Sequence, residues 1–160
     1  MQESYILFIC RANVWRSQIA EWLYRKYSDD RVMSIAGAEA KKEKYHGRPL
    51  PAIIDFLHKN WDTDISSQNI SYLSDIPLHI LRSIRSIYFL YDPRIETDCD
   101  IACQLEGMSP YDYFQKQGID IIITPIEDPF DGWVSRYDHI VRAIDTLITS
   151  LSGSISSSTP

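Results

Sequence analysis

The sequence contains few cysteine residues, with only Cys10, Cys99 and Cys103 among its 160 residues. This small, odd number argues against a framework of several disulfide bonds, and no Cys/His grouping has the spacing of a structural zinc site. A chain of this length can bury a sufficient apolar core without such cross-links. We therefore expect a single globular domain that needs neither disulfide bonds nor a structural metal.

Positive charge is also scarce, because 16 Lys and Arg residues stand against 22 Asp and Glu residues, which gives a net charge of −6. Binding to nucleic acid or to a membrane surface needs a basic face, so this balance argues against both partners. No apolar run approaches the ~20 residues that span a bilayer, and the first residues lack the basic segment of a signal peptide. The expected location is the cytoplasm, and any anion site must be local.

Four segments rich in Ile, Val, Tyr and Phe, residues 5–9, 31–36, 86–91 and 119–124, are typical of buried strands. They lack strict polar and apolar alternation, as parallel strands covered on both faces do. Helical patterns lie at residues 17–27, 50–59, 77–82, after Pro93, and at 134–151. This alternation predicts an α/β fold: a single-domain, doubly wound sheet of about four parallel strands with helices on both faces.

The expected domain covers residues 1–151. The remaining residues, 152–160, are rich in serine. Such a segment buries too little apolar surface to offset the entropy of ordering it, so we expect a flexible tail.

Residues 10–17, Cys-Arg-Ala-Asn-Val-Trp-Arg-Ser, join the first predicted strand to the first predicted helix. Helix-start and loop N–H groups form an electropositive nest for an anion, which also favours the thiolate form of a cysteine. Arg16 adds a planar, charged fork that can grip two phosphoryl oxygens. We expect Ser17 to cap the helix and to donate a hydrogen bond to the Cys10 sulfur. The predicted phosphate-binding residues are Arg11, Ala12, Asn13, Val14, Trp15 and Ser17.

Taken alone, Cys10 is more simply interpreted as a small buried apolar residue at a strand end, with Arg16 as a solvated helix residue. The order of strand, loop, serine and amphipathic helix, with a candidate acid far downstream, favours the functional interpretation. In a doubly wound sheet, ligands bind at the carboxyl ends of the strands, where this loop is expected.

The chain resembles the low-molecular-weight protein tyrosine phosphatases over roughly residues 4 to 150. The resemblance rests on Cys-x5-Arg-Ser after the first strand and on Ile-Glu-Asp-Pro-Phe at residues 126–130. Between them, residues 34–38 resemble the family's Ser-Ala-Gly segment, residues 47–49 its Gly-x-Pro, and Tyr91-Asp92 its strand-end aspartate.

This resemblance implies that Cys10 attacks the phosphorus of an aryl phosphate and forms a phosphocysteine. Asp128 would protonate the departing phenol and then activate the hydrolytic water, with no metal or cofactor. Because the protonated fraction of an aspartate falls as pH rises, activity should favour mildly acidic pH. Tyr45 and Phe130 would line the pocket for a phosphotyrosine protein or a small aryl phosphate. The sequence does not indicate an oligomeric state.

Several residues depart from the family pattern near the predicted site. Ala12 replaces a glycine, Trp15 a second loop cysteine and Gln18 a proline, and Ile35 stands where a serine would hold the loop asparagine. Further along, Gln68 and Ser71 replace the His and Arg that the family often carries. We therefore expect weaker support for the loop, and strain at Ala12 if that position needs a positive φ.

Two other functions use the same residues. An arsenate reductase would use Cys10 with Cys99 and Cys103 as relays, on what looks like one helical face. A catalytically weak module would bind phosphate or phosphotyrosine without turnover, in keeping with the altered loop.

Overall fold

The computed structural model describes residues 4–126 and 134–156. A single sheet of four parallel strands forms its centre, in the order β2-β1-β3-β4. The strands are β1 (Tyr5–Cys10), β2 (Arg31–Ala36), β3 (Ile84–Phe89) and β4 (Asp120–Ile123). The predicted α/β sheet of about four parallel strands is confirmed, although β3 begins and ends two residues before the predicted segment 86–91.

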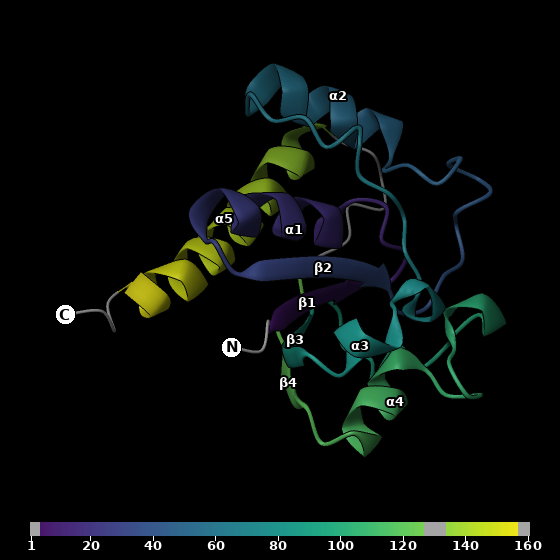
Figure 1. The fold of residues 1–160 in the computed structure, drawn as a ribbon. Coiled ribbons are helices and arrows are strands. Elements are labelled where there is room, and N and C mark those ends of the chain that lie inside the picture. The colour runs from purple at the N-terminus through teal and green to yellow at the C-terminus, as the bar shows by residue number, and fades with distance from the viewer. Residues whose placement is uncertain (1–3, 127–133, 157–160) are drawn as a thin grey trace.

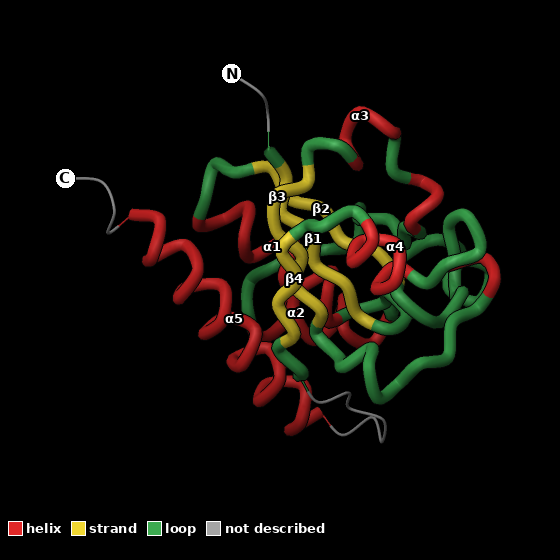
Figure 2. Tube along the Cα trace, turned by 90° about the horizontal axis from the view of Figure 1, so that it is seen from below, coloured by secondary structure: helices red, strands yellow, loops and turns green. Residues whose placement is uncertain are grey.

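Helices cover both faces of this sheet (Figure 1). The helices α1 (Arg16–Tyr27), α2 (Pro51–Asn60) and α5 (Val134–Ser156) lie on one face, and the shorter α3 (Leu78–Leu81) and α4 (Pro110–Lys116) lie on the other. Figure 2 looks at the sheet from below, from the side of α3 and α4, with α5 running along one side of the strands. The arrangement is the doubly wound one that alternating strands and helices predict.

The alternation of side chains along β1 divides the core into two clusters. Ile6, Phe8 and Cys10 face the α1 and α5 side, whereas Leu7 and Ile9 face the α3 and α4 side. All five side chains are buried, because β1 is flanked by β2 and β3 and covered on both faces. This explains why the strand is apolar without interruption.

Two expected boundaries are wrong. The segment after Pro93 forms no α-helix until α4 begins at Pro110, and contains only the 3₁₀ helix Ile101–Cys103. The last helix continues beyond residue 151 to Ser156, so the predicted tail begins too early. An established helix extends at a small cost per residue, and serine is only moderately unfavourable within it. Residues 157–160 lie outside the described residues, and no helix in the described part is long and apolar enough to cross a membrane.

Candidate active site

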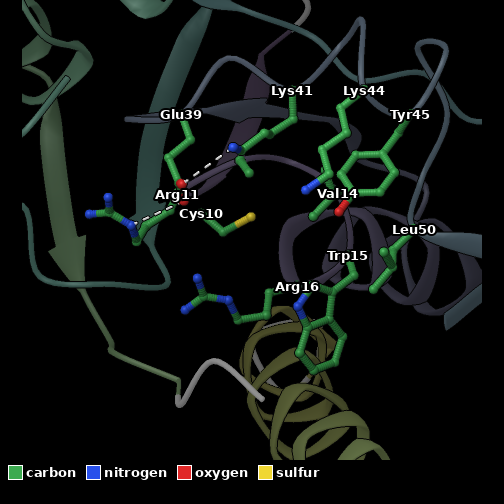
Figure 3. A pocket seen from close by; sticks show the side chains of 11 residues that line it. Cys10, Arg11, Val14, Trp15, Arg16, Glu39, Lys41, Lys44, Tyr45 and Leu50 are labelled. Atoms are coloured by element: carbon green, nitrogen blue, oxygen red, sulfur yellow. Dashed lines mark hydrogen bonds and ion pairs between the residues drawn. The ribbon is translucent and has the colours of Figure 1, made fainter. Parts of the chain in front are cut away.

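The loop between β1 and α1 lies at the carboxyl end of the central strand and forms the floor of a cavity. The cavity has a volume of about 360 Å³. Its lining residues are Cys10, Arg11, Ala12, Val14, Trp15, Arg16, Glu39, Lys41, Lys44, Tyr45 and Leu50 (Figure 3). The structure thus brings together seven of the predicted site residues and buries Asn13 and Ser17 behind them. Asp128 and Phe130 lie outside the described residues.

Two hydrogen-bond donors meet the Cys10 sulfur. The Ser17 Oγ lies 3.0 Å from Sγ, and the backbone N–H of Asn13 donates to Sγ over 3.3 Å. The direction of the Ser17 bond follows from its neighbour, because Asn13 Nδ2 donates to Ser17 Oγ over 2.6 Å. The hydroxyl proton of Ser17 is therefore left for the sulfur. Both contacts stabilise negative charge on the sulfur.

The same asparagine amide is held on its other side. Asn13 Nδ2 also donates to Ser34 Oγ over 2.9 Å, and Ser34 donates in turn to Glu21 Oε1 over 3.1 Å. Burial raises the pKa of Glu21, while Arg25 and the Ser34 hydrogen bond oppose that rise. A chain of four hydrogen bonds thus runs from the Glu21 carboxyl group to the Cys10 sulfur, and each hydroxyl in it has a defined direction.

The backbone of the loop shows no strain at Ala12. Positive φ occurs next to it at Asn13, with φ of 58°, and Ala12 is not among the residues with positive φ. Asparagine tolerates the left-handed region better than most residues. The expected penalty for alanine in place of glycine is therefore absent.

Ser34, and not Ile35, holds the loop asparagine. In the parallel register Phe8 pairs with Ser34 and Cys10 with Ala36, so Ser34 shares the face of Cys10. Ile35 points to the opposite face and is buried in the apolar cluster there. The expectation that Ile35 removes this support is wrong, because successive strand residues point to opposite faces.

A pair of buried glutamines supplies further support that the sequence did not predict. Gln18 Nε2 donates to the carbonyl oxygens of Asn13 and Asn69, each over 2.9 Å. Gln68 Nε2 donates to Gln18 Oε1 over 2.6 Å, and the Ser71 N–H donates to Asn13 Oδ1 over 2.8 Å. The loop is therefore supported by the two glutamine side chains and by the Ser71 backbone, in addition to Ser17 and Ser34.

Arg16 begins α1 and is buried beside Cys10. Its Nη1 donates to the carbonyl oxygen of Leu90 over 3.2 Å and to that of Ile126 over 2.8 Å. The guanidinium thus lies at the carboxyl edge of the sheet, below Cys10 in Figure 3.

The N-cap of α1 is Trp15, so Ser17 lies inside the helix and the predicted capping role is wrong.

Arg11 turns its guanidinium away from the cavity (Figure 3). It forms a two-pronged ion pair with Asp98 and lies 3.4 Å from carboxylate oxygens of both Glu39 and Glu96. The hydrogen bond from Arg11 holds the pKa of Asp98 below its usual value. The side chain therefore ties the loop to residues 96–98.

Apolar side chains form one wall of the cavity. Val14, Trp15, Tyr45 and Leu50 line it, which places the predicted Tyr45 at the pocket. The Trp15 ring is buried and meets the Tyr137 ring of α5 edge-on at a centroid distance of 5.6 Å. Most of that indole therefore belongs to the core.

The two remaining cysteines lie apart from the cavity lining. Cys99 is half-buried and its Sγ lies 3.4 Å from the carbonyl oxygen of Gly37. Cys103 is fully buried, and burial raises the pKa of its thiol to about 12. The predicted shared helical face is absent, because the 3₁₀ helix begins after Cys99.

Within the described residues, no group of His, Cys, Asp or Glu side chains is arranged to hold a metal ion.

Sequence reasoning missed Gln18, Glu21, Gln68, Lys41 and Lys44. The polar residues of α1 carried one usable signal, since Gln18 and Glu21 follow the loop directly, in the first half of the helix. The lysines carried another, because four of the eight residues from 41 to 48 are Lys or Arg in an acidic chain.

No protein-family model matches the sequence, and a search of curated proteins finds no match. Solved structures match the fold. YwlE of Bacillus subtilis superposes with a TM-score of 0.67 at 13% identity, over 96% of this chain and 99% of the other. Wzb of Vibrio vulnificus, in complex with benzylphosphonate, gives 0.67 at 16% identity over 96% and 99%. An arsenate reductase of Archaeoglobus fulgidus gives 0.62 at 15% identity over 92% and 98%.

These likenesses establish the fold, which is the one shared by low-molecular-weight phosphatases and arsenate reductases. Another YwlE structure is described as an arginine phosphatase with a phosphorylated active-site serine. Fold alone does not select one chemistry among these proteins.

Proposed function

We propose that this protein is an enzyme that hydrolyses aryl phosphate monoesters, phosphotyrosine in particular, through a phosphocysteine intermediate on Cys10. One observation carries the proposal. The Cys10 sulfur, at the cavity floor, receives hydrogen bonds from the Ser17 hydroxyl and the Asn13 N–H, where α1 begins. A sulfur held this way in an electropositive loop is an activated nucleophile for an oxyanion.

In the first step, the Cys10 thiolate attacks phosphorus, and the bond from phosphorus to the phenolic oxygen breaks. Asp128, proposed as the general acid, gives its proton to the leaving oxygen. The loop N–H groups and Arg16 stabilise the negative charge on the other phosphoryl oxygens. The products of this step are a free phenol and a phosphocysteine.

In the second step, water attacks the phosphorus while the Asp128 carboxylate accepts a proton from it. The sulfur–phosphorus bond breaks, inorganic phosphate forms and the thiolate returns. The proton that Ser17 directs at Sγ stabilises the developing charge on this leaving sulfur. The Ser17 hydrogen bond is therefore assigned to the breakdown of the intermediate.

The walls of the cavity support an aromatic leaving group. Val14, Tyr45 and Leu50 offer apolar surface next to the loop, and an aromatic ring packs favourably against another ring. Benzylphosphonate, the molecule bound to Wzb, also combines an aromatic ring with a tetrahedral phosphorus group. Phe130 stays a proposed second wall.

Arsenate reduction is the competing activity, since arsenate reductases share the fold and the chain carries two further cysteines. It would require Cys99 and Cys103 to act as thiolates in turn. Burial raises the pKa of both thiols, and Cys103 has no exposed surface. These features favour the phosphatase.

A module without turnover is disfavoured because the polar support of the loop is complete around Asn13.

The test is hydrolysis of para-nitrophenyl phosphate, a phosphotyrosine peptide and a phosphoarginine peptide between pH 5 and 8. Cys10→Ser and Arg16→Ala should abolish turnover of the aryl substrates, and Asp128→Ala should slow it strongly. The rate should fall as pH rises, because the acid must be protonated. Arsenate-dependent thiol consumption is measured in parallel, with Cys99→Ser and Cys103→Ser as variants.

Three other results would each support a different function. Reduction of arsenate that needs Cys99 or Cys103, without ester cleavage, would establish the reductase. Phosphate binding by the intact protein without turnover would establish the binding module. Faster cleavage of phosphoarginine than of phosphotyrosine would replace the proposed substrate.

A further inference from the structure

The segment 41–48 concentrates positive charge at the mouth of the cavity in a chain whose net charge is −6. Two of its four cations are already engaged. Lys42 pairs with Asp75, and Arg48 Nη1 donates to the Ser67 carbonyl oxygen over 2.9 Å and to Asn69 Oδ1 over 3.0 Å. These contacts fasten the segment to the rest of the protein.

The other two cations, Lys41 and Lys44, line the cavity together with Cys10. Lys41 Nζ lies 3.9 Å from a carboxylate oxygen of Glu39, at the limit of an ion pair. Lys44 Nζ lies 5.5 Å from the centroid of the Tyr45 ring and forms no ion pair with a carboxylate of the described residues. Figure 3 shows the Lys44 side chain directed into the space between Tyr45 and the Cys10 sulfur.

The phosphoryl group itself does not account for these lysines. The loop N–H groups and Arg16 neutralise the charge of a phosphate on Cys10. Lys41 and Lys44 come from a separate segment that forms the rim, not the floor. Arg11, another cation near the nucleophile, already forms ion pairs with Asp98, Glu39 and Glu96.

The size of the cavity limits what can sit beside the phosphate. Its volume of about 360 Å³ is at the small end for ligand pockets. It can take a single phosphorylated ring, so whatever flanks that ring in a larger substrate must lie over the rim. Lys41 and Lys44 are the lysines that line the cavity on the side of the segment 41–48.

We propose, on the basis of the phosphatase function proposed above, that the cavity selects phosphotyrosine with an acidic residue next to it in a peptide. The ammonium of Lys44 pairs with the flanking carboxylate while the phosphotyrosine ring packs against Tyr45. Lys41 plays a smaller part, because Glu39 already offsets its charge. Lys44 therefore determines specificity by binding the acidic residue next to the phosphotyrosine.

The expected preference is modest and sensitive to salt. A solvent-exposed ion pair changes an equilibrium by about two- to five-fold. Salt screens such a pair, since the Debye length falls from about 10 Å at 0.1 M to about 3 Å at 1 M ionic strength. A preference that disappears at high salt separates this ion pair from an apolar contact with the same peptide.

The experiment compares kcat/KM for three phosphotyrosine peptides that differ only in the residues beside the phosphotyrosine: Glu, Gln or Lys. The native protein should prefer the Glu peptide over the Gln peptide by about two- to five-fold at low salt and cleave the Lys peptide slowest. In Lys44→Gln the Glu-to-Gln ratio should fall to about one, and in Lys41→Gln it should fall less. Lys116→Gln, an exposed lysine on α4, is the matched control and should keep the native ratio.

The outcomes separate this inference from the proposed function. Equal cleavage of all three peptides would overturn the inference and leave the phosphatase intact. A preference for Glu that persists in Lys44→Gln or at 1 M salt would overturn the role of Lys44. Failure to cleave the peptides and para-nitrophenyl phosphate alike would overturn the phosphatase itself.

Discussion

The Ser17 hydroxyl lies 3.0 Å from the Cys10 sulfur, and its proton is directed at that sulfur because Asn13 occupies the oxygen from the other side. A hydroxyl that is free to rotate would divide its time among several acceptors. Here the donor is oriented before substrate arrives, so the sulfur is prepared both to attack and to leave.

Ser17→Ala should lower kcat for para-nitrophenyl phosphate by about 10- to 100-fold, because the leaving sulfur loses its hydrogen bond. Breakdown of the phosphocysteine should become slower than its formation, so stopped-flow measurements should show a burst of nitrophenol close to one equivalent. Ser109→Ala is the control, since it removes the N-cap hydrogen bond of α4 and should not alter kcat. A native kcat without a burst in Ser17→Ala would contradict this role.

Asn13→Ala and Asn13→Gly separate backbone conformation from hydrogen bonding. Both variants lose the amide that orients Ser17 and Ser34, so both should lose most activity. Only alanine must also adopt the left-handed backbone, with φ of 58°. The alanine variant should therefore be less stable than the glycine variant by about 1 kcal/mol in urea unfolding. Equal stabilities would mean that the loop changes its backbone conformation in the variants.

Gln18→Leu should destabilise the protein by about 2 kcal/mol or more, because it leaves buried partners of the amide without a hydrogen bond. Gln68→Leu should cost less, since fewer of its partners lose a bond. Because one hydrogen bond joins the two side chains, the double variant should be more stable than the sum of the single effects predicts, by about 1 kcal/mol. Strict additivity in the denaturation cycle would argue against their pairing.

Alkaline pH should destabilise the protein through Cys103. Burial raises the pKa of this thiol to about 12, whereas an unfolded cysteine has a pKa of about 8.5. Between these values the unfolded chain loses a proton that the native state keeps, so the free energy of unfolding falls as pH rises. The contribution is at most about 1.4 kcal/mol per pH unit.

Urea unfolding at pH 7.5, 8.5 and 9.5 under reducing conditions measures this slope. Cys103→Ala should lose stability at neutral pH but show a shallower fall above pH 8.5. An unchanged slope in the variant would assign the alkaline loss to other groups, such as Cys99, whose pKa is also raised by burial.

The fold could be predicted from the sequence because each strand is an uninterrupted apolar run between helical patterns. The position of the loop followed from the same order of elements, since ligands of such sheets meet the carboxyl ends of strands. Helix ends were less predictable. The Ser-rich residues 152–156 continue α5, because extending a helix needs less favourable sequence than starting one.

The support of the site could not be predicted from the sequence, because it joins residues that are far apart in the chain. Ser34 and Ile35 are neighbours, and only the register of β2 against β1 decides which of them faces Asn13. Gln18 of α1 and Gln68, which follows α2, are 50 residues apart and are joined by a hydrogen bond. A position-by-position comparison with the family pattern counts Gln18, Ile35 and Gln68 as lost supports of the loop. In the folded protein, Ser34, Gln18 and Gln68 supply hydrogen bonds that support it.

The nucleophile and the rim of the cavity belong to parts of the protein with different mechanical support. Cys10 ends the central strand β1 and pairs with Ala36 of β2, so its position can change only if the sheet opens. Lys41, Lys44 and Tyr45 belong to a partly exposed turn segment, which Lys42 and Arg48 fasten to the rest of the protein. Mutation can therefore redesign the choice of substrate on this segment while the reacting atom keeps its place, which makes the protein a suitable scaffold for the evolution of new specificities.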